Sequence, residues 1–178
     1  MTRSIDEFAF SSDPAVGALL ATLAAATPEN SRIIELGTGA GAGLASLVRG
    51  VGERTDVHVV SVDNDAEQVA AVRAAGWPDY VEFVIGDAAA VIRERAPFDL
   101  VFADAPSGKI EGLADTIAAL RLGGMLVVDD MDPQLHLDDG LLEPLIAVRD
   151  QIVSHPELIS VELDYASGVI VATRRSSL

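Results

Sequence analysis

A glycine-rich stretch directly after the apolar run 32–36 is the first feature that could bind a ligand. Glycine occupies every second position there, at Gly37, Gly39, Gly41 and Gly43. Because glycine has no Cβ, the backbone can turn sharply and approach a ligand closely. The helix expected next would offer its free N–H groups. Two glycines are enough for a tight turn, so the spacing favours a ligand-binding loop.

An aspartate ends the second apolar run, 57–62. Asp63 lies 26 positions beyond Gly37, close to the spacing at which nucleoside and dinucleotide sites place the acid that binds ribose. Asp65 can cap the helix that follows. Asp63 and its neighbour Asn64 are therefore free to meet a ligand.

Asp87 ends the third run, 80–85, and precedes Ala88. Taken alone, Asp87 is expected to cap a helix. On the same edge of a sheet as Asp63, its carboxylate could also accept a hydrogen bond from an adenine amino group. The residues that follow the first three apolar runs therefore have the chemistry expected of a nucleoside-binding cleft.

Three further aspartates follow the fourth and fifth runs, 98–103 and 125–128: Asp104, Asp129 and Asp130. We expect these runs to be neighbours, so that the three carboxylates converge. Two like charges about 4 Å apart repel by roughly 4 kcal/mol at an effective dielectric constant of about 20. Either one carboxyl is protonated, or a cation such as Mg²⁺, Ca²⁺ or Mn²⁺ lies between them. Asp130 could instead face solvent.

The elements that must position these residues alternate between short β-branched runs and alanine-rich helical stretches, which indicates a parallel sheet with right-handed crossovers. The interior runs are almost continuously apolar, as in strands buried on both faces. Strands are expected at 32–36, 57–62, 80–85, 98–103, 125–128, 158–163 and 168–173. Helices are expected from Asp13-Pro14 onward and at 44–48, 66–75, 88–95, 110–120 and 141–154.

The predicted fold class is therefore α/β, a Rossmann-like, doubly wound sheet with helices on both faces. Its seven strands are expected in the order 3-2-1-4-5-7-6, mostly parallel with an antiparallel C-terminal hairpin strand. In such sheets a ligand binds beyond the carboxyl ends of the strands. That edge is where the glycines and aspartates lie.

The length and composition limit the number of domains and the classes of partner that are expected. The 178 residues are expected to form a single domain, 1–178, with 1–30 as a helical lead-in. Lys plus Arg number 12 and Asp plus Glu 28, a net charge of −16, which argues against a nucleic-acid partner or an anionic membrane. No cysteine is present, which excludes disulfides and a cysteine nucleophile. We expect a cytoplasmic protein that forms a homodimer and acts on a small molecule.

Together these residues resemble the class I S-adenosylmethionine-dependent methyltransferases, over nearly the whole chain. The stretch Glu35-x-Gly37-x-Gly39-x-Gly41 is similar to the family motif that holds the methionine part of the cofactor. The resemblance implies ribose binding by Asp63 and adenine binding beside it. The cofactor-binding residues that it implies are Glu35, Gly37, Thr38, Gly39, Gly41, Asp63, Asn64, Asp87, Ala88 and Asp104.

Within that class the chain is most similar to small metal-dependent O-methyltransferases of the catechol and caffeoyl-CoA type. The similarity lies in residues 12–20, 98–105 and 122–130. It implies that Asp104, Asp129 and Asp130 hold a divalent cation, with Mg²⁺ the first choice, which orients the acceptor and lowers its pKa. The implied activity is O-methyl transfer to a small hydroxylated, phenolic or catechol-like acceptor, with Asp104 as a catalytic residue.

The sequence departs from that pattern at several positions. Asp130 stands where asparagine is usual, and Ser107 stands where the catalytic lysine is usual. Lys109, two positions later, could take the role of base or hold an acidic group of the substrate, or it could be a solvated residue at the start of a helix. Ala42 and Gly43 replace the usual Tyr-Ser pair.

Three alternatives remain beside the metal-assisted enzyme. One is a metal-independent small-molecule methyltransferase, and another is a degenerate protein that binds S-adenosylmethionine without turnover. The third is a nicotinamide-dependent oxidoreductase, but the third glycine of that fingerprint would fall at Ala42. His136, in the loop after the aspartates, could also reach the acceptor.

Overall fold

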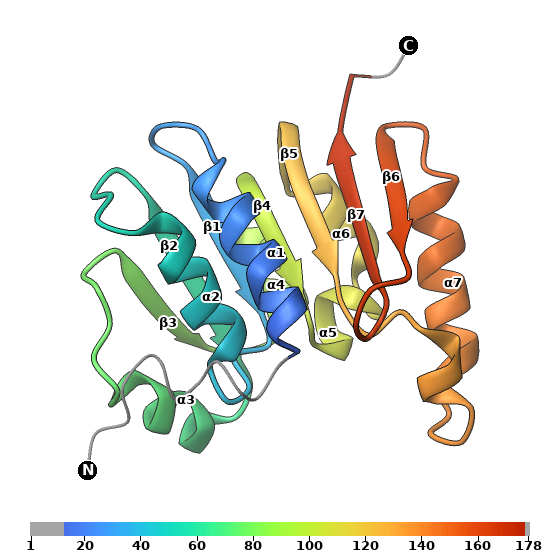
Figure 1. Cartoon of the computed structure of the whole chain (residues 1–178), viewed down its shortest axis with the longest axis horizontal. Helices are drawn as coiled ribbons and strands as arrows, with labels where there is room; N and C mark the ends of the chain where they lie inside the picture. Colours follow the sequence, from blue (N-terminus) through green and yellow to red (C-terminus); the bar gives the residue numbers. More distant parts are fainter. Residues whose placement is uncertain (1–12, 177–178) are drawn as a thin grey trace.

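The structure is a computed structural model that describes residues 13–176, so residues 1–12 and 177–178 of the predicted domain lie outside it. One sheet is formed in the order β3-β2-β1-β4-β5-β7-β6 (Figure 1). Its strands are β1 (Arg32–Leu36), β2 (His58–Asp63), β3 (Val81–Ile85), β4 (Phe98–Ala103), β5 (Leu120–Val128), β6 (Leu158–Leu163) and β7 (Val169–Arg174). Strands β1 to β5 pair in parallel, and β7 is antiparallel to β5 and β6. The predicted fold class, strand order and hairpin are confirmed.

Helices cover both faces of the sheet. They are α1 (Pro14–Ala25), α2 (Ala42–Val51), α3 (Ala66–Arg73), α4 (Ala88–Arg95), α5 (Pro106–Lys109), α6 (Leu113–Ala118) and α7 (Leu142–Val153), with a 3₁₀ helix, η2 (Pro133–His136). Figure 1 shows α1 and α2 in front of the sheet. Successive strand residues point to opposite faces, so Ile33 belongs to the core cluster that includes residues of α1 and α2, and Ile34 to the cluster on the other face, which includes residues of α4 and α6.

Helices α1 and α2 cross at very short range. A Cβ placed on Gly50 would lie 2.2 Å from the carbonyl oxygen of Ala21, and one on Gly17 would lie 2.7 Å from Oγ of Ser46. Only a residue without a side chain allows such an approach. The crossing anchors α2, whose first turn follows the glycine-rich loop.

Strand β5 begins earlier than the sequence indicated. Leu120 already pairs with Phe98, five residues before the predicted start at Met125, and the register shifts between the two halves. A Cβ on Gly124 would lie 2.9 Å from the carbonyl oxygen of Phe98, so the glycine allows the two backbones to meet. The helix predicted over 110–120 is therefore wrong in its bounds and is shortened to α6.

Aspartates cap the helices α1, α3 and α4 where the sequence indicates a helix start. The side chain of Asp13 accepts a hydrogen bond from the Ala15 N–H at 2.8 Å, ahead of Pro14. The side chain of Asp65 accepts from Glu67 and Gln68 at the start of α3. Across residues 13–176, none of the helices combines the length and apolar character needed to cross a membrane.

Candidate active site

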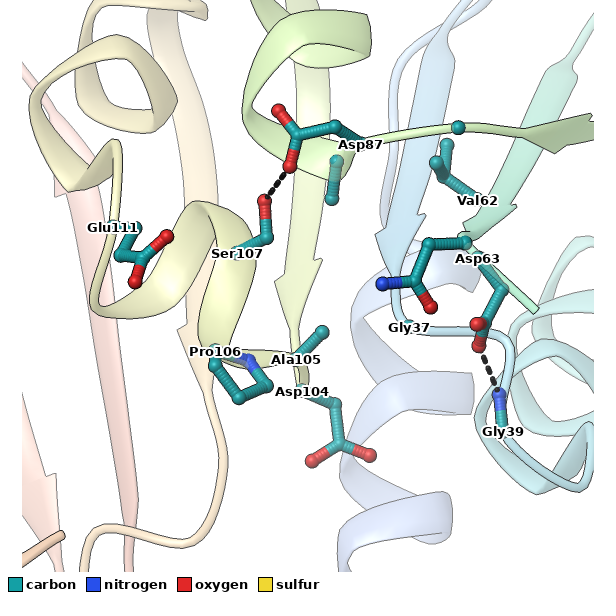
Figure 2. Close-up of a pocket in the computed structure, with 13 residues that line it drawn as sticks. Gly37, Gly39, Val62, Asp63, Asp87, Asp104, Ala105, Pro106, Ser107 and Glu111 are labelled. Atoms are coloured by element: carbon teal, nitrogen blue, oxygen red, sulfur yellow. Dashed lines mark hydrogen bonds between the residues drawn. The ribbon is translucent and has the colours of Figure 1, made fainter.

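A cleft of about 490 Å³ opens at the carboxyl ends of the parallel strands. Its lining includes predicted cofactor residues, namely Gly37, Gly39, Asp63, Asn64, Asp87, Ala88 and Asp104. Figure 2 shows the labelled residues arriving from four segments, namely the loop after β1, the end of β2, the end of β3 and the turn after β4. The lining also includes residues that the sequence did not single out for this role, namely Val62, Ala105, Pro106, Ser107 and Glu111.

The glycine-rich loop is tied to both neighbouring strands. Gly37 has φ +104°, and its N–H donates to the Val62 carbonyl at 2.8 Å. A Cβ on Gly37 would lie 3.0 Å from that of Ala105. Gly39 has φ +47°, and no atom lies within 4 Å of where its Cβ would be. The loop therefore has open space beside Gly39.

The carboxylate of Asp63 is held in place by two backbone groups. Its Oδ2 accepts from the Gly39 N–H at 3.1 Å, and its Oδ1 accepts from the Asp65 N–H at 3.0 Å. Figure 2 shows the first of these bonds. Asp65, and not Asp63, caps α3, as the sequence predicted. Each carboxylate oxygen keeps a lone pair for a hydroxyl group.

Glu35 lies beneath the loop and does not line the cleft. Its side chain is 1% exposed, and its Oε2 accepts from Oγ of Ser61 at 2.5 Å, while that Oγ is 2.8 Å from Oγ1 of Thr38. Burial raises the pKa of Glu35 well above its ordinary value. A Cβ on Gly43 would come within 2.3 Å of Oε1 of Glu35. The absence of a side chain at Gly43 therefore makes space for the buried carboxyl group of Glu35.

Gly41 and Thr38, like Glu35, are not part of the cleft lining. Gly41 is the N-terminal cap of α2 with φ +92°, and Thr38 is buried. With Glu35, they form the support of the loop. Cofactor binding by Glu35, Thr38 and Gly41 stays a prediction.

Asp87 is bonded on both oxygens. Its Oδ2 accepts from the Ala90 N–H at 2.9 Å, which caps α4, and its Oδ1 accepts from Oγ of Ser107 at 2.5 Å (Figure 2). Oγ of Ser107 in turn accepts from the Ala89 N–H at 3.1 Å. The bond from Ser107 is the main cause that lowers the pKa of Asp87. This link between two residues of the cleft lining could not be read from the sequence, because nothing in it pairs positions 87 and 107.

The carboxyl groups of Asp104, Asp129 and Asp130 converge, as the sequence predicted. Burial, followed by the charges of Asp129 and Asp130, raises the pKa of Asp104 to about 7. Oδ1 of Asp129 accepts from Oγ of Ser167 at 2.5 Å and from the Asp130 N–H at 2.8 Å. We call these three aspartates the acid cluster.

Lys109 reaches the acid cluster from the turn after β4. It is 6% exposed, and its Nζ donates to the main-chain carbonyl of Asp129 at 3.0 Å. Its charge acts to lower the pKa of Asp104 and of Asp129. The interpretation of Lys109 as a solvated residue is therefore wrong.

The acid cluster does not fit a divalent cation in this arrangement. Among residues 13–176, no three His, Asp or Glu side chains form a group that could hold a metal ion. The Lys109 ammonium bonds to the main-chain carbonyl of Asp129 and not to its carboxylate. The ligand set implied for Asp104, Asp129 and Asp130 is therefore present as residues but not as a metal-binding geometry.

His136 lies away from the cleft lining. Its Nδ1 is 2.7 Å from Oδ2 of Asp139, and its Nε2 is buried without a hydrogen-bond partner among the described residues. Nothing in this geometry supports a contact between His136 and an acceptor bound in the cleft.

Comparisons with known proteins show the family to which the chain belongs. Residues 34–131 match a family model described as a methyltransferase domain. A protein of Mycobacterium sp. strain JLS named as an O-methyltransferase is 33% identical over 183 aligned positions, covering 97% of this chain and 83% of that protein. A catechol O-methyltransferase of Mycobacterium tuberculosis is 34% identical, covering 65% of this chain and 54% of that protein.

A solved structure has the same fold. The O-methyltransferase TomG of Streptomyces achromogenes, in complex with S-adenosylmethionine, superimposes with a TM-score of 0.75 and 22% identity, covering 93% of this chain and 81% of TomG. With its fold, its cleft and these relatives, the chain belongs to the methyltransferase family, as a class I S-adenosylmethionine-dependent O-methyltransferase. The nicotinamide-dependent oxidoreductase is thereby set aside.

Proposed function

We propose that this chain methylates a hydroxyl oxygen of a small phenolic or catechol-like acceptor. One observation carries the proposal: Asp104 belongs both to the lining of the cleft and to the acid cluster. A donor in the cleft and a hydroxyl group at the cluster would then be neighbours. The relative named as a catechol O-methyltransferase supports the acceptor class.

The cleft residues would hold the methyl donor. Gly37 and Gly39 let the backbone approach the methionine part, and Asp63 accepts hydrogen bonds from the ribose hydroxyls. Asn64, Asp87 and Ala88 border the adenine. Glu35, Thr38 and Gly41 act as positioning residues beneath the loop.

The acid cluster and Lys109 would act on the acceptor. When bound, S-adenosylmethionine supplies a sulfonium methyl group, and the carbon–oxygen bond to it forms as the carbon–sulfur bond breaks with its electron pair left on sulfur. Asp104 receives the hydroxyl proton, directly or through a neighbouring carboxyl. The Lys109 ammonium stabilises the negative charge that develops on the oxygen.

The sequence also predicted assistance by Mg²⁺ or another divalent cation. The lack of a three-ligand group among residues 13–176 favours the alternative, which is transfer without a metal. The homodimer, the cytoplasmic location and the absence of nucleic-acid and membrane partners stay predictions, the last supported by the net charge of −16.

Titration calorimetry with S-adenosylmethionine, with NADH as a control, is the first test. We expect S-adenosylmethionine to bind and NADH to release no heat. Mass spectrometry of a panel of catechols and simple phenols would then detect an added methyl group. Asp104→Ala is expected to abolish turnover and keep most of the donor affinity. Absence of donor binding, or turnover within a few-fold of wild type in Asp104→Ala, would contradict the proposal.

A further inference from the structure

The loop between β6 and β7, residues 164–168, reaches the acid cluster from the far end of the chain. Its Ser167 donates from Oγ to Oδ1 of Asp129 at 2.5 Å, across 38 positions of the sequence. Asp129 is 4% exposed, and a buried carboxylate needs hydrogen-bond donors to compensate the loss of water. Ser167 supplies one of them, and it supplies it from a loop that has no other contact with the acid cluster side chains.

The backbone on either side of the Ser167 hydroxyl is fixed. The N–H of Met131 donates to the Gly168 carbonyl at 2.9 Å, and the N–H of Asp132 donates to the Ser167 carbonyl at 2.9 Å. Gly168 has φ +78°, and a Cβ on it would lie 2.3 Å from the Asp132 nitrogen. Because the loop packs directly against the segment that follows the acid cluster, Oγ of Ser167 has a defined position relative to Asp129.

Asp129 itself is held through its main chain and through one carboxylate oxygen. Its N–H donates to the Ala103 carbonyl at 3.3 Å, and its carbonyl accepts from Nζ of Lys109 at 3.0 Å. Asp130 lies in the left-handed region with φ +55°, which residues with a side chain rarely adopt, and its N–H donates to Oδ1 of Asp129 at 2.8 Å. The hydroxyl of Ser167 and the N–H of Asp130 therefore meet at the same oxygen.

The other carboxylate oxygen of Asp129, Oδ2, accepts no hydrogen bond from residues 13–176, since both bonds to this carboxylate end at Oδ1. A carboxylate oxygen has lone pairs for a hydroxyl group. Ala103 pairs with Val128 in the sheet, so Asp104 and Asp129 follow directly paired residues of neighbouring strands. Asp104 lines the cleft, and Oδ2 of Asp129 is thus the oxygen left for a ligand beside it.

We propose that Ser167 is a positioning residue for methyl transfer, because it holds Oδ1 of Asp129 and so presents Oδ2 to a hydroxyl group of the acceptor. The inference rests on the proposed function, which places the acceptor at the acid cluster. It adds no proton transfer: Asp129 accepts a hydrogen bond, and Asp104 receives the proton. A carboxylate that is free to rotate would hold the acceptor in fewer productive orientations, which lowers the rate of the chemical step.

Ser167→Ala is the first test, with catechol as the acceptor and S-adenosylmethionine as the donor. We expect kcat to fall by about tenfold and the Kd of the donor, measured by calorimetry, to stay unchanged, because Ser167 lies outside the cleft lining. Ser167→Thr keeps the hydroxyl group and should restore most of kcat. An unchanged kcat in Ser167→Ala, or an equal loss in kcat and donor affinity, would overturn the proposal.

Ser154→Ala is the matched control. It removes a serine hydroxyl that donates to the Asp150 carbonyl at 2.6 Å, at the end of α7, and should change neither kcat nor donor affinity. Ser167→Cys, whose thiol is a weak donor, replaces Ser167→Ala if that variant does not fold. The expected loss of kcat is the same in direction.

A double-mutant cycle tests whether Ser167 acts through Asp129. Asp129→Ala removes the carboxylate, so Ser167→Ala in the same background should cause no further loss. The Kd of catechol for the complex with S-adenosylhomocysteine gives the same comparison without turnover. Independent losses that multiply in the double variant would show that Ser167 acts elsewhere.

Crystal structures of the wild type and Ser167→Ala supply a measurement that needs no acceptor. We expect one orientation of the Asp129 carboxylate in the wild type, and a rotated carboxylate or two conformers in Ser167→Ala. The same single orientation in both would overturn the proposal. A wild type that binds S-adenosylmethionine but neither binds nor methylates catechol would count against the proposed acceptor class, whereas the two crystal structures decide whether Ser167 holds Asp129.

Discussion

Ser107 donates a 2.5 Å hydrogen bond to Asp87 and so joins the turn after β4 to the first turn of α4. The two residues lie 20 positions apart in the sequence and are adjacent in the lining of the cleft (Figure 2). The bond orients the carboxylate that we assign to the adenine side. It also fixes the turn that leads to Lys109, so donor binding and the acid cluster share one segment.

Ser107→Ala is expected to weaken binding of S-adenosylmethionine by roughly fivefold, because a hydrogen bond contributes about 1 kcal/mol. Calorimetry measures the change. Ser160→Ala removes a hydroxyl from β6, away from the cleft lining, and should leave the affinity unchanged. Equal affinities for Ser107→Ala and the wild type would show that Asp87 is positioned without Ser107.

Asp63→Asn is expected to weaken donor binding by about tenfold or more, since an amide nitrogen cannot accept a hydroxyl proton and the charge on the ribose side is lost. Asp65→Asn is the matched control, because asparagine caps a helix as well as aspartate does. Equilibrium dialysis with labelled donor compares the two variants. Similar losses in both would contradict the separation of roles between Asp63 and Asp65.

Gly50→Ala is expected to destabilise the protein by about 1–3 kcal/mol, because its Cβ would overlap the Ala21 carbonyl. Urea denaturation gives the free energy of unfolding. Gly86→Ala is the control, since its Cβ would meet only Val91, at 3.5 Å. An unchanged unfolding free energy in Gly50→Ala would mean that α1 and α2 separate at little cost.

The pH dependence of stability should reveal Glu35. Its pKa in the folded chain lies well above the ordinary 4.5, mainly through burial, so the folded state holds a proton that the unfolded state releases. The stabilisation is complete below pH 4.5 and is lost as the pH rises through the folded pKa. Glu35→Gln keeps a neutral polar group and should flatten the fall in thermal midpoint with rising pH. A wild-type midpoint that rises over this range would contradict the assignment.

The strands and the helix caps could be predicted from the sequence because both depend on local patterns, whereas the strand order was expected from the alternation of strands and helices. Continuous apolar runs mark strands buried on both faces, and Asp65 stands at the first turn of a helical stretch. The edge at which a ligand binds follows from the same topology. The sequence alone therefore predicts that the glycine loop and Asp63 lie at this edge.

The rest depends on contacts between distant segments. The bond between Ser107 and Asp87 and the burial of Lys109 arise from the left-handed turn at Gly108, which packs against Leu36. The early start of β5 depends on the approach of Gly124 to Phe98. No periodicity in the sequence encodes these approaches. The turn at Gly108 in particular places Lys109 next to the acid cluster.

A chain with one buried lysine has an unusual chemical property. Amine-reactive acylating reagents find no other side-chain amine in this sequence, so the rate at which they modify Lys109 measures how often the site opens to solvent. Slow acylation that becomes slower with donor bound would mean that the turn after β4 closes on its ligand. The lysine that we assign to the acid cluster is thus also a reporter of the site's own motion.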